Sequence, residues 1–127
     1  RRKTPVRTTG QLAAIVRRAM PKRGWQRIDP ATRTFQAIRI WVNQELDGLE
    51  RALEVICRRL RGGARVVIIT FHSLEDRIVK HTLRALARGQ EAIVRILTKH
   101  PLVADLDERD RNPRARSAKL RAAERIA

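Results

Sequence analysis

The sequence of 127 residues is long enough for one domain and too short for two ordinary ones. Hydrophobic residues make up 43% of it, which is close to the globular average and excludes wholesale disorder. Lysine and arginine number 29 against 13 acidic residues, so the net charge is +16. Such a chain is attracted to polyanions, of which nucleic acid is the commonest, and a basic solvated surface is the alternative.

The positive charge is concentrated at the two ends of the chain. Residues 1–27 hold nine basic residues and no acid, and residues 109–127 hold seven against two, whereas residues 28–108 hold 13 against 11. The longest strongly apolar run, residues 66–69, is far too short for a membrane span. The three histidines and the single cysteine show no metal-ligand spacing, so neither a membrane nor a metal is expected as a partner.

In chain order, the first predicted element is a helix that begins after Thr8 or Thr9 and ends at Pro21, with a loop behind it. Over residues 32–60 apolar side chains recur every three or four positions, which is the pattern of an amphipathic helix. Gly48 and the aspartate before it interrupt the pattern. One long helix and two successive helices sharing one face are therefore both compatible with the sequence.

Residues 65–70 are a continuous β-branched run, which predicts a strand buried on both faces. A helix with a capping-box spelling at Ser73 follows, and residues 93–97 are a second strand candidate. Residues 104–116 are charged and contain a proline, which predicts a loop, while residues 118–126 fit a helix by their alanines and a strand by their alternation. This order of elements predicts an α/β fold with a doubly wound sheet.

The predicted strand-to-helix turn gathers four side chains that can do chemistry: His72, Ser73, Glu75 and Asp76. In open α/β sheets, ligands bind beyond the carboxyl ends of the strands, next to helix N-termini. The same residues also suit helix capping, with Ser73 as the cap and Asp76 as its partner. Spacing alone leaves both interpretations open.

Two further groups of residues suit nucleic acid. One lies on the opening turns of the helix predicted after residue 30 and comprises Thr32, Arg33, Gln36 and Arg39. The other lies in the basic tail and comprises Arg114, Arg116, Lys119 and Arg121. These side chains are suited to phosphates or base edges, and equally to a solvated face. Neither common spelling of a glycine-rich phosphate loop occurs in the chain.

Four strings carry a family resemblance: Arg-Thr-Thr-Gly-Gln-Leu at 7–12, Asp-Pro-Ala-Thr-Arg-Thr-Phe-Gln-Ala-Ile-Arg-Ile at 29–40, Thr-Phe-His-Ser-Leu-Glu-Asp-Arg-Ile-Val-Lys at 70–80, and Asn-Pro-Arg-Ala-Arg-Ser-Ala-Lys-Leu-Arg at 112–121. In this order they resemble the bacterial small-subunit ribosomal RNA cytosine-N4 methyltransferases, the RsmH or MraW family. The resemblance spans nearly the whole chain. The sequence departs from the family at Asp29, where histidine is usual, and at Arg61, where proline usually precedes the two glycines.

The resemblance implies a class I, Rossmann-like methyltransferase with a helical domain inserted into its sheet. Such an enzyme uses S-adenosylmethionine to methylate the exocyclic amine of a cytidine in 16S ribosomal RNA, in the cytoplasm. Residues 1–28 would be the end of the inserted helical domain, and residues 29–127 the carboxyl-terminal half of the methyltransferase domain. The family's glycine-rich cofactor loop lies upstream of this chain, so no cofactor-binding residue is assigned and the chain alone is not expected to be active.

The resemblance also implies roles for individual residues. His72, Ser73, Glu75 and Asp76 would lie at the lip of the active-site pocket, where they would orient the base or accept a late proton. The residues expected to bind ribosomal RNA are Thr32, Arg33, Gln36, Arg39, Arg77, Arg114, Arg116, Lys119 and Arg121. A non-enzymatic basic RNA-binding module, such as a ribosome-associated protein, is the alternative that explains the charge equally well.

The resemblance finally implies an order for three strands. Residues 65–70, 92–97 and 118–123 would be strands five, six and seven of the sheet, with the last one antiparallel between the other two. The strand over residues 65–70 would then lack its other neighbour, and an exposed apolar strand edge attracts further strands. We expect this edge to be covered by the missing half, by a second copy of the chain or by a strand swap.

Overall fold

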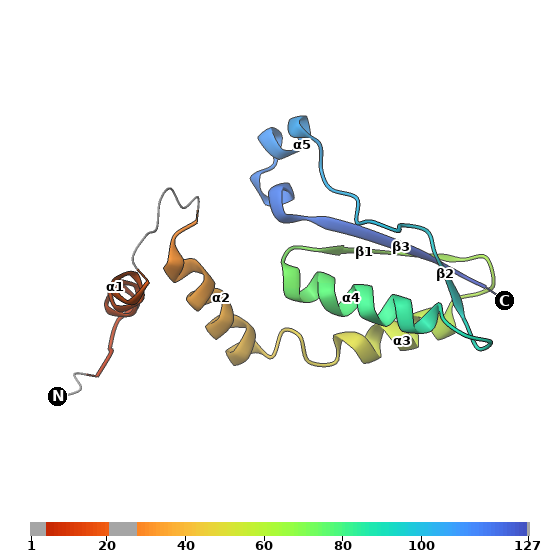
Figure 1. Cartoon of the computed structure of the whole chain (residues 1–127), viewed down its shortest axis with the longest axis horizontal. Helices are drawn as coiled ribbons and strands as arrows, with labels where there is room; N and C mark the ends of the chain where they lie inside the picture. The colour runs from red at the N-terminus through yellow and green to blue at the C-terminus, as the bar shows by residue number, and fades with distance from the viewer. Residues whose placement is uncertain (1–4, 21–27, 127) are drawn as a thin grey trace. The chain divides into compact units, whose positions relative to one another are not determined.

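The computed structural model describes residues 5–20 and 28–126 (Figure 1). The chain falls into two compact units, Arg1–Glu45 and Leu46–Ala127. The resemblance implies a different boundary, between residues 28 and 29. That boundary separates two domains of the family and is not defined by compactness, so it stays a prediction. No helix within the described ranges is long and apolar enough to cross a membrane.

The first unit contains the helices α1 (Thr9–Ala19) and α2 (Pro30–Asn43). Thr8 begins α1 with a capping box: its hydroxyl accepts from the Gln11 backbone N–H at 3.2 Å, and the Gln11 side chain accepts from the Thr8 backbone N–H at 3.2 Å. Asp29 caps α2 by accepting from the backbone N–H two residues further on, at 2.9 Å. The helix start predicted at Thr8 is confirmed, while its predicted end at Pro21 lies outside the described residues.

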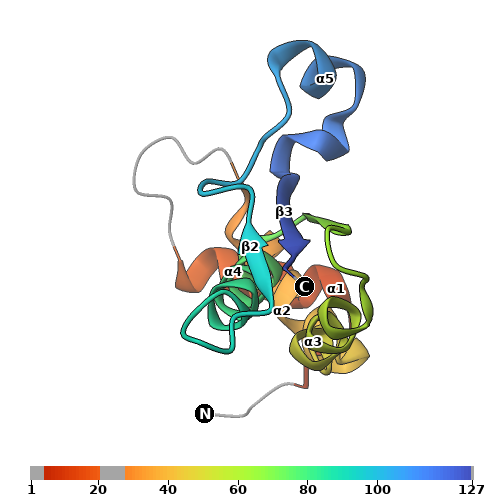
Figure 2. The same cartoon turned by 90° about the vertical axis from the view of Figure 1, so that its right-hand side faces the viewer.

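The second unit is a three-stranded sheet with two helices on one face. Its elements are α3 (Leu49–Arg59), β1 (Arg65–Thr70), α4 (Ser73–Leu86), β2 (Val94–Ile96), α5 (Leu106–Arg111), the 3-10 helix η1 (Pro113–Ser117) and β3 (Lys119–Arg125). Figures 1 and 2 show α3 and α4 on the same side of the sheet. The core between these helices and the sheet is formed by Leu53, Cys57, Val79, Leu83, Leu86, Val94 and Ala123.

The strands of this sheet have the order β1-β3-β2, and β3 is antiparallel to both neighbours. The order implied for the three predicted strands is therefore confirmed. Residues 118–126, for which helix and strand were both open, form a strand. The reason is that Ala122 and Ala123 are buried in the middle of the sheet, where packing outweighs the helix propensity of alanine.

The amphipathic pattern over residues 32–60 corresponds to two helices rather than one. The break covers residues 44–48, between the end of α2 and the start of α3. Gln44 and Gly48 adopt left-handed conformations there, with φ of 52° and 76°. A left-handed residue ends the helical path, so the interruption seen at Gly48 in the sequence is a real boundary.

The segment over residues 104–116, which the sequence predicts to be a loop, contains α5 and η1 instead. Each of these short helices begins at a side-chain cap. Asp105 accepts from the backbone N–H three residues on at 2.7 Å, and Asn112 accepts from the N–H two residues on at 3.1 Å. The expected loop is thus wrong for most of this range, because local capping orders a charged sequence that has no apolar periodicity.

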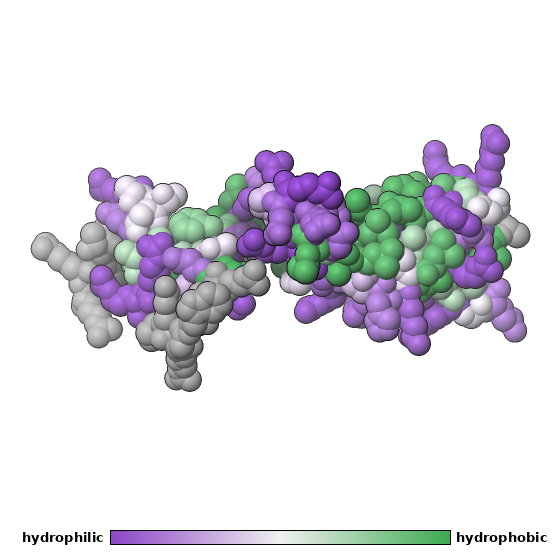
Figure 3. All heavy atoms as spheres, turned by 90° about the horizontal axis from the view of Figure 1, so that it is seen from above, coloured by the Kyte–Doolittle hydropathy of each residue, from purple (hydrophilic) through white to green (hydrophobic). Residues whose placement is uncertain are grey.

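The face of the sheet opposite α3 and α4 is apolar and exposed, so the prediction that the strand over residues 65–70 is buried on both faces is wrong within the described residues. Val67 and Ile69 point to this face and are 58% and 55% exposed. Figure 3 looks onto this side and shows hydrophobic side chains gathered over the sheet. A hollow of about 260 Å³ is lined by Ile69, Leu102, Val103, Ala104, Glu108, Ala118 and Leu120. β1 is also an edge strand, since no other strand of the described residues pairs with its free side.

Candidate functional site

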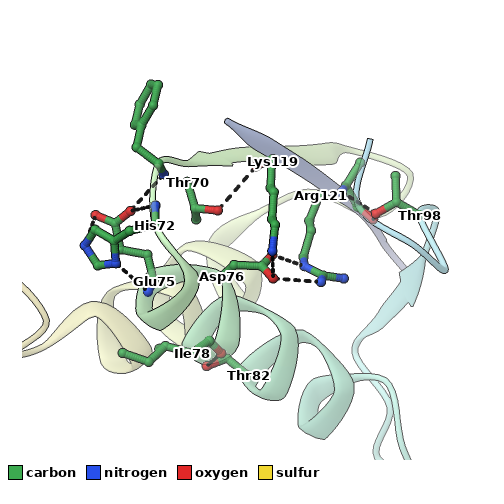
Figure 4. Close-up of polar contacts among 11 residues, drawn as sticks. Thr70, His72, Glu75, Asp76, Ile78, Thr82, Thr98, Lys119 and Arg121 are labelled. Atoms are coloured by element: carbon green, nitrogen blue, oxygen red, sulfur yellow. Dashed lines mark hydrogen bonds and ion pairs between the residues drawn. The ribbon is translucent and has the colours of Figure 1, made fainter. Parts of the chain in front are cut away.

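The turn between β1 and α4 is closed by a capping box in which a histidine replaces the usual hydroxyl residue (Figure 4). Nδ1 of His72 accepts from the Glu75 backbone N–H at 3.3 Å. Oε2 of Glu75 accepts from the backbone N–H groups of Phe71 at 2.9 Å and of His72 at 3.3 Å. The interpretation of Ser73 as the cap, with Asp76 as its partner, is therefore wrong, because His72 holds the extended cap conformation and Ser73 lies inside the first turn.

This box holds the His72 ring in one orientation. Because Nδ1 accepts a hydrogen bond, the neutral ring carries its proton on Nε2. The side chain is only 10% exposed, and Nε2 has no hydrogen-bond partner among the described residues, although Glu75 Oε1 lies at an ion-pair distance of 3.3 Å. Helix capping is thus the role that the geometry shows for His72 and Glu75.

Asp76 lies in a buried ion pair rather than at an open site (Figure 4). Arg121 donates from Nε to Oδ1 at 2.7 Å and from Nη2 to Oδ2 at 3.2 Å, and Lys119 Nζ donates to Oδ2 at 3.4 Å. The hydrogen bond from Arg121 is the main reason why the pKa of Asp76 lies below its ordinary value, while burial acts in the opposite direction. Asp76 is therefore a carboxylate that ties the first turn of α4 to β3.

Ser73 is the member of the predicted catalytic group whose side chain remains open. It is the first residue of α4, it is exposed, and its hydroxyl makes no hydrogen bond within the described part of the chain. Arg77 is also exposed and forms no ion pair with the described residues. The structure thus brings His72 and Glu75 together, engages Asp76 in a separate contact, and leaves Ser73 exposed without a side-chain partner among the described residues.

The predicted RNA-binding residues of the first unit all lie on α2. Thr32 and Arg33 are exposed, and Gln36 is half-buried. Arg39 is exposed as well, but its Nε lies 3.0 Å from Oε1 of Glu45. Thr32 and Arg33 are therefore the members of this group whose polar atoms are open to a ligand.

The predicted RNA-binding residues of the second unit are of two kinds. Arg114 and Arg116 belong to η1, are exposed like Arg77, and form no ion pair within the described ranges. Lys119 and Arg121 contact Asp76 instead, and Arg121 is only 7% exposed. Arg121 does not lie on an open surface, because its guanidinium lines a cavity, and its contact with RNA stays a prediction.

This cavity holds cations that the sequence analysis did not single out. Its volume is about 240 Å³, and it is lined by Lys80, Leu83, Arg84, Ile96, Thr98, Lys99 and Arg121. Lys80 and Arg84 follow Asp76 at intervals of four residues, which places all three on one face of α4. This spacing is the feature of the sequence from which Lys80 and Arg84 could have been predicted. Lys99 reaches the cavity from the segment after β2, and no local pattern links it to α4.

The turn after β1 has few open groups that could hold a cofactor such as S-adenosylmethionine. The strand-to-helix turn after β1 contains no glycine that would let a cofactor approach the backbone closely. Its two acids, Glu75 and Asp76, already accept hydrogen bonds from the chain itself. No group of three or more metal-binding side chains occurs within residues 5–20 and 28–126.

The second unit is a mixed α/β fold with a small sheet. A turn at the carboxyl end of β1 leads into helix α4, and many basic side chains on the surface are exposed. The sequence model of the MraW methylase family matches residues 1–126, and the chain belongs to this family.

Three curated relatives illustrate the similarity, and each bears the name Ribosomal RNA small subunit methyltransferase H. The protein of Acidobacterium capsulatum is 58% identical over 124 residues, which are 98% of this chain and 41% of the relative. The protein of Trichlorobacter lovleyi is 49% identical over 140 residues, which cover 99% of this chain and 45% of the relative. The protein of Nitratidesulfovibrio vulgaris is 54% identical over 134 residues, which cover 94% of this chain and 42% of the relative. The chain spans less than half the length of these relatives.

Proposed function

We propose that this chain is the RNA-facing part of an enzyme that transfers a methyl group from S-adenosylmethionine to the N4 amine of a cytidine in small-subunit ribosomal RNA. The observation that carries the proposal is the family match, which covers residues 1–126. The names of the relatives support ribosomal RNA as the substrate class. The +16 net charge supports the same class of partner.

In this proposal the turn between β1 and α4 presents Ser73 to the target base. The capping box of His72 and Glu75 fixes the turn, and the contact of Asp76 with Arg121 holds α4 against β3. An amine that attacks a sulfonium methyl group needs alignment more than strong acid–base help, so rigid support of one hydroxyl is a fitting contribution. The base would leave its stack to reach this edge of the sheet.

The exposed arginines would hold the RNA backbone in this proposal. Arg77 lies one turn into α4, and Arg114 and Arg116 lie on η1, without acidic partners in the described residues. Unpaired guanidinium groups are suited to phosphate oxygens. Thr32 and Arg33 of the first unit would contact the same RNA.

The cofactor would be held by the part of the relatives' sequence that this chain does not cover. β1, β2 and β3 would be strands five, six and seven of a Rossmann-like sheet, and α1 would belong to the inserted helical domain. The free edge of β1 and its apolar outer face, with Val67 and Ile69, would be covered in a protein of the relatives' full length.

A non-enzymatic RNA-binding module is the second candidate. The net charge of +16 favours it for the chain taken alone. It does not account for the family match over 1–126. The two candidates differ in whether a protein of the relatives' full length modifies RNA or only binds it.

The test is a methyl-transfer assay with small ribosomal subunits and methyl-labelled S-adenosylmethionine, followed by digestion of the RNA and mass spectrometry of its nucleosides. A protein of the relatives' full length that contains this chain should produce N4-methylcytidine, and the 127-residue chain alone should produce none. Binding of the RNA without any methylated nucleoside would favour the second candidate. Methylation of a different atom would contradict the N4 assignment but would still support methyltransferase activity.

A further inference from the structure

The cavity beside β2 is ringed by positive charge. Lys80 and Arg84 reach it from α4, Lys99 from the segment after β2, and Arg121 from β3. No acidic residue of the described ranges belongs to the cavity lining. Four cations from three segments far apart in sequence therefore converge on one hollow of about 240 Å³.

Three of these cations have no counter-ion within the described residues. Lys80, Arg84 and Lys99 form no ion pair there, and Arg84 and Lys99 are exposed. Arg121 is already paired through Nε and Nη2 with Asp76, which fixes the plane of its guanidinium. Like charges held around one cavity repel each other, and an anion at its centre removes that repulsion.

The cavity lies beyond the carboxyl end of β2 and beside the middle of β3. β3 is antiparallel to both β1 and β2, so β1 and β2 run parallel and their carboxyl ends point to one edge. Lys99 follows the carboxyl end of β2, just as the capped turn follows that of β1. Ligands in such folds bind beyond this edge.

We propose that this cavity binds a phosphate group, with Lys80, Arg84, Lys99 and Arg121 as its ligands. Leu83 and Ile96 form an apolar wall beside the cations, which suits the sugar attached to a phosphate. The inference rests on the proposed function, because the phosphate is assumed to belong to the RNA substrate. A free nucleotide offers the same chemistry, and the experiment below separates the two sources.

The experiment measures the fluorescence anisotropy of a labelled short single-stranded RNA with the 127-residue chain. The cavity variant is Lys80→Gln with Arg84→Gln, and the matched control is Arg58→Gln with Arg59→Gln, which removes the same charge from exposed positions in the last turn of α3. The cavity variant should bind RNA at least about tenfold more weakly at low salt, and the control less than about threefold. The salt slope of the cavity variant should become shallower by about 0.7, the value for one lost phosphate contact on a single strand.

Cytidine 5′-monophosphate and cytidine form the second arm. If the cavity takes a phosphate of the RNA, the monophosphate should displace the RNA from the unaltered chain and cytidine should not. If the variant binds RNA normally but no longer binds the monophosphate, the free nucleotide is the source. Equal losses of RNA affinity in the cavity and control variants, or no loss of either ligand in the cavity variant, would overturn the proposal.

Folding is monitored by circular dichroism for every variant. Should the double variant lose its fold, Lys99→Gln repeats the test, because Lys99 is exposed and lies outside the helices and strands. The readout is binding and not methyl transfer. A protein that binds phosphate in the cavity but methylates nothing would therefore refute the proposed function alone. A protein that methylates RNA, while its cavity variant binds both the RNA and the monophosphate normally, would refute this inference alone.

Discussion

Replacing Asp76 by asparagine tests the buried contact that holds α4 against β3. The substitution keeps the size of the side chain and removes its charge, so the guanidinium of Arg121, which is 7% exposed, loses its counter-ion. Removing one partner of a buried ion pair costs about 3–5 kcal/mol. The asparagine oxygen still accepts one hydrogen bond, and the Lys119 side chain is 37% exposed, so we expect a loss near the lower limit, about 3 kcal/mol.

The assay is urea unfolding of the 127-residue chain, followed by circular dichroism. Glu124→Gln is the matched control, because Glu124 bridges Arg65 and Arg95, whose side chains are 69% and 68% exposed. Pairs with such exposed partners contribute little, so the control should lose much less stability than the Asp76 variant. Equal losses of unfolding free energy in the two variants would show that burial does not make the Asp76 contact more stabilising than an exposed one.

The same contact sets the sign of the acid dependence. The pKa of Asp76 is lowered in the folded chain, so its stabilising contribution is complete above the ordinary carboxyl pKa of about 3.9 and is lost as the pH falls through the lowered folded value. The Asp76→Asn chain should therefore lose less stability than the unaltered chain on acidification below that ordinary value. Parallel pH profiles of the two chains would show that Asp76 is not the group responsible.

Three further predictions concern the core and the turn. Leu83 is 1% exposed, so Leu83→Ala should cost about 2–5 kcal/mol in urea unfolding, whereas Leu74→Ala, at a position 41% exposed on the same helix, should cost far less. Burial raises the pKa of the Cys57 thiol, so iodoacetamide should label Cys57 only in the unfolded chain, and rapid labelling of the native chain would contradict its place in the core. Ser73→Ala should lower the methyl-transfer turnover of a full-length protein roughly tenfold without changing its stability, and an unchanged turnover would remove Ser73 from the site.

The strands and helices were largely predictable because their signals are local. The β-branched run of residues 65–70 and the periodicity on either side of Gly48 each specify an element without reference to the rest of the chain. The final strand was ambiguous, since Ala122 and Ala123 favour a helix until the sheet buries them. The strand order came from the family resemblance, because pairing between segments this far apart leaves no local trace.

The polar contacts were harder to predict, for two physical reasons. A histidine cap such as His72 lacks the hydroxyl that sequence rules look for, although its Nδ1 accepts the same hydrogen bond. The pairing of Asp76 with Arg121 joins residues 45 positions apart, and only the register of β3 brings them together. For this reason the sequence placed Arg121 in an open basic tail, whereas the structure shows its side chain to be buried.

Our proposal that the cofactor is held outside this chain is tested most directly by calorimetric titration with S-adenosylmethionine. We predict saturable binding to a protein of the relatives' full length and no binding to the folded 127-residue chain. Saturable binding to the 127-residue chain itself would contradict the account, because a working cofactor pocket would then exist among residues that we assign to the RNA.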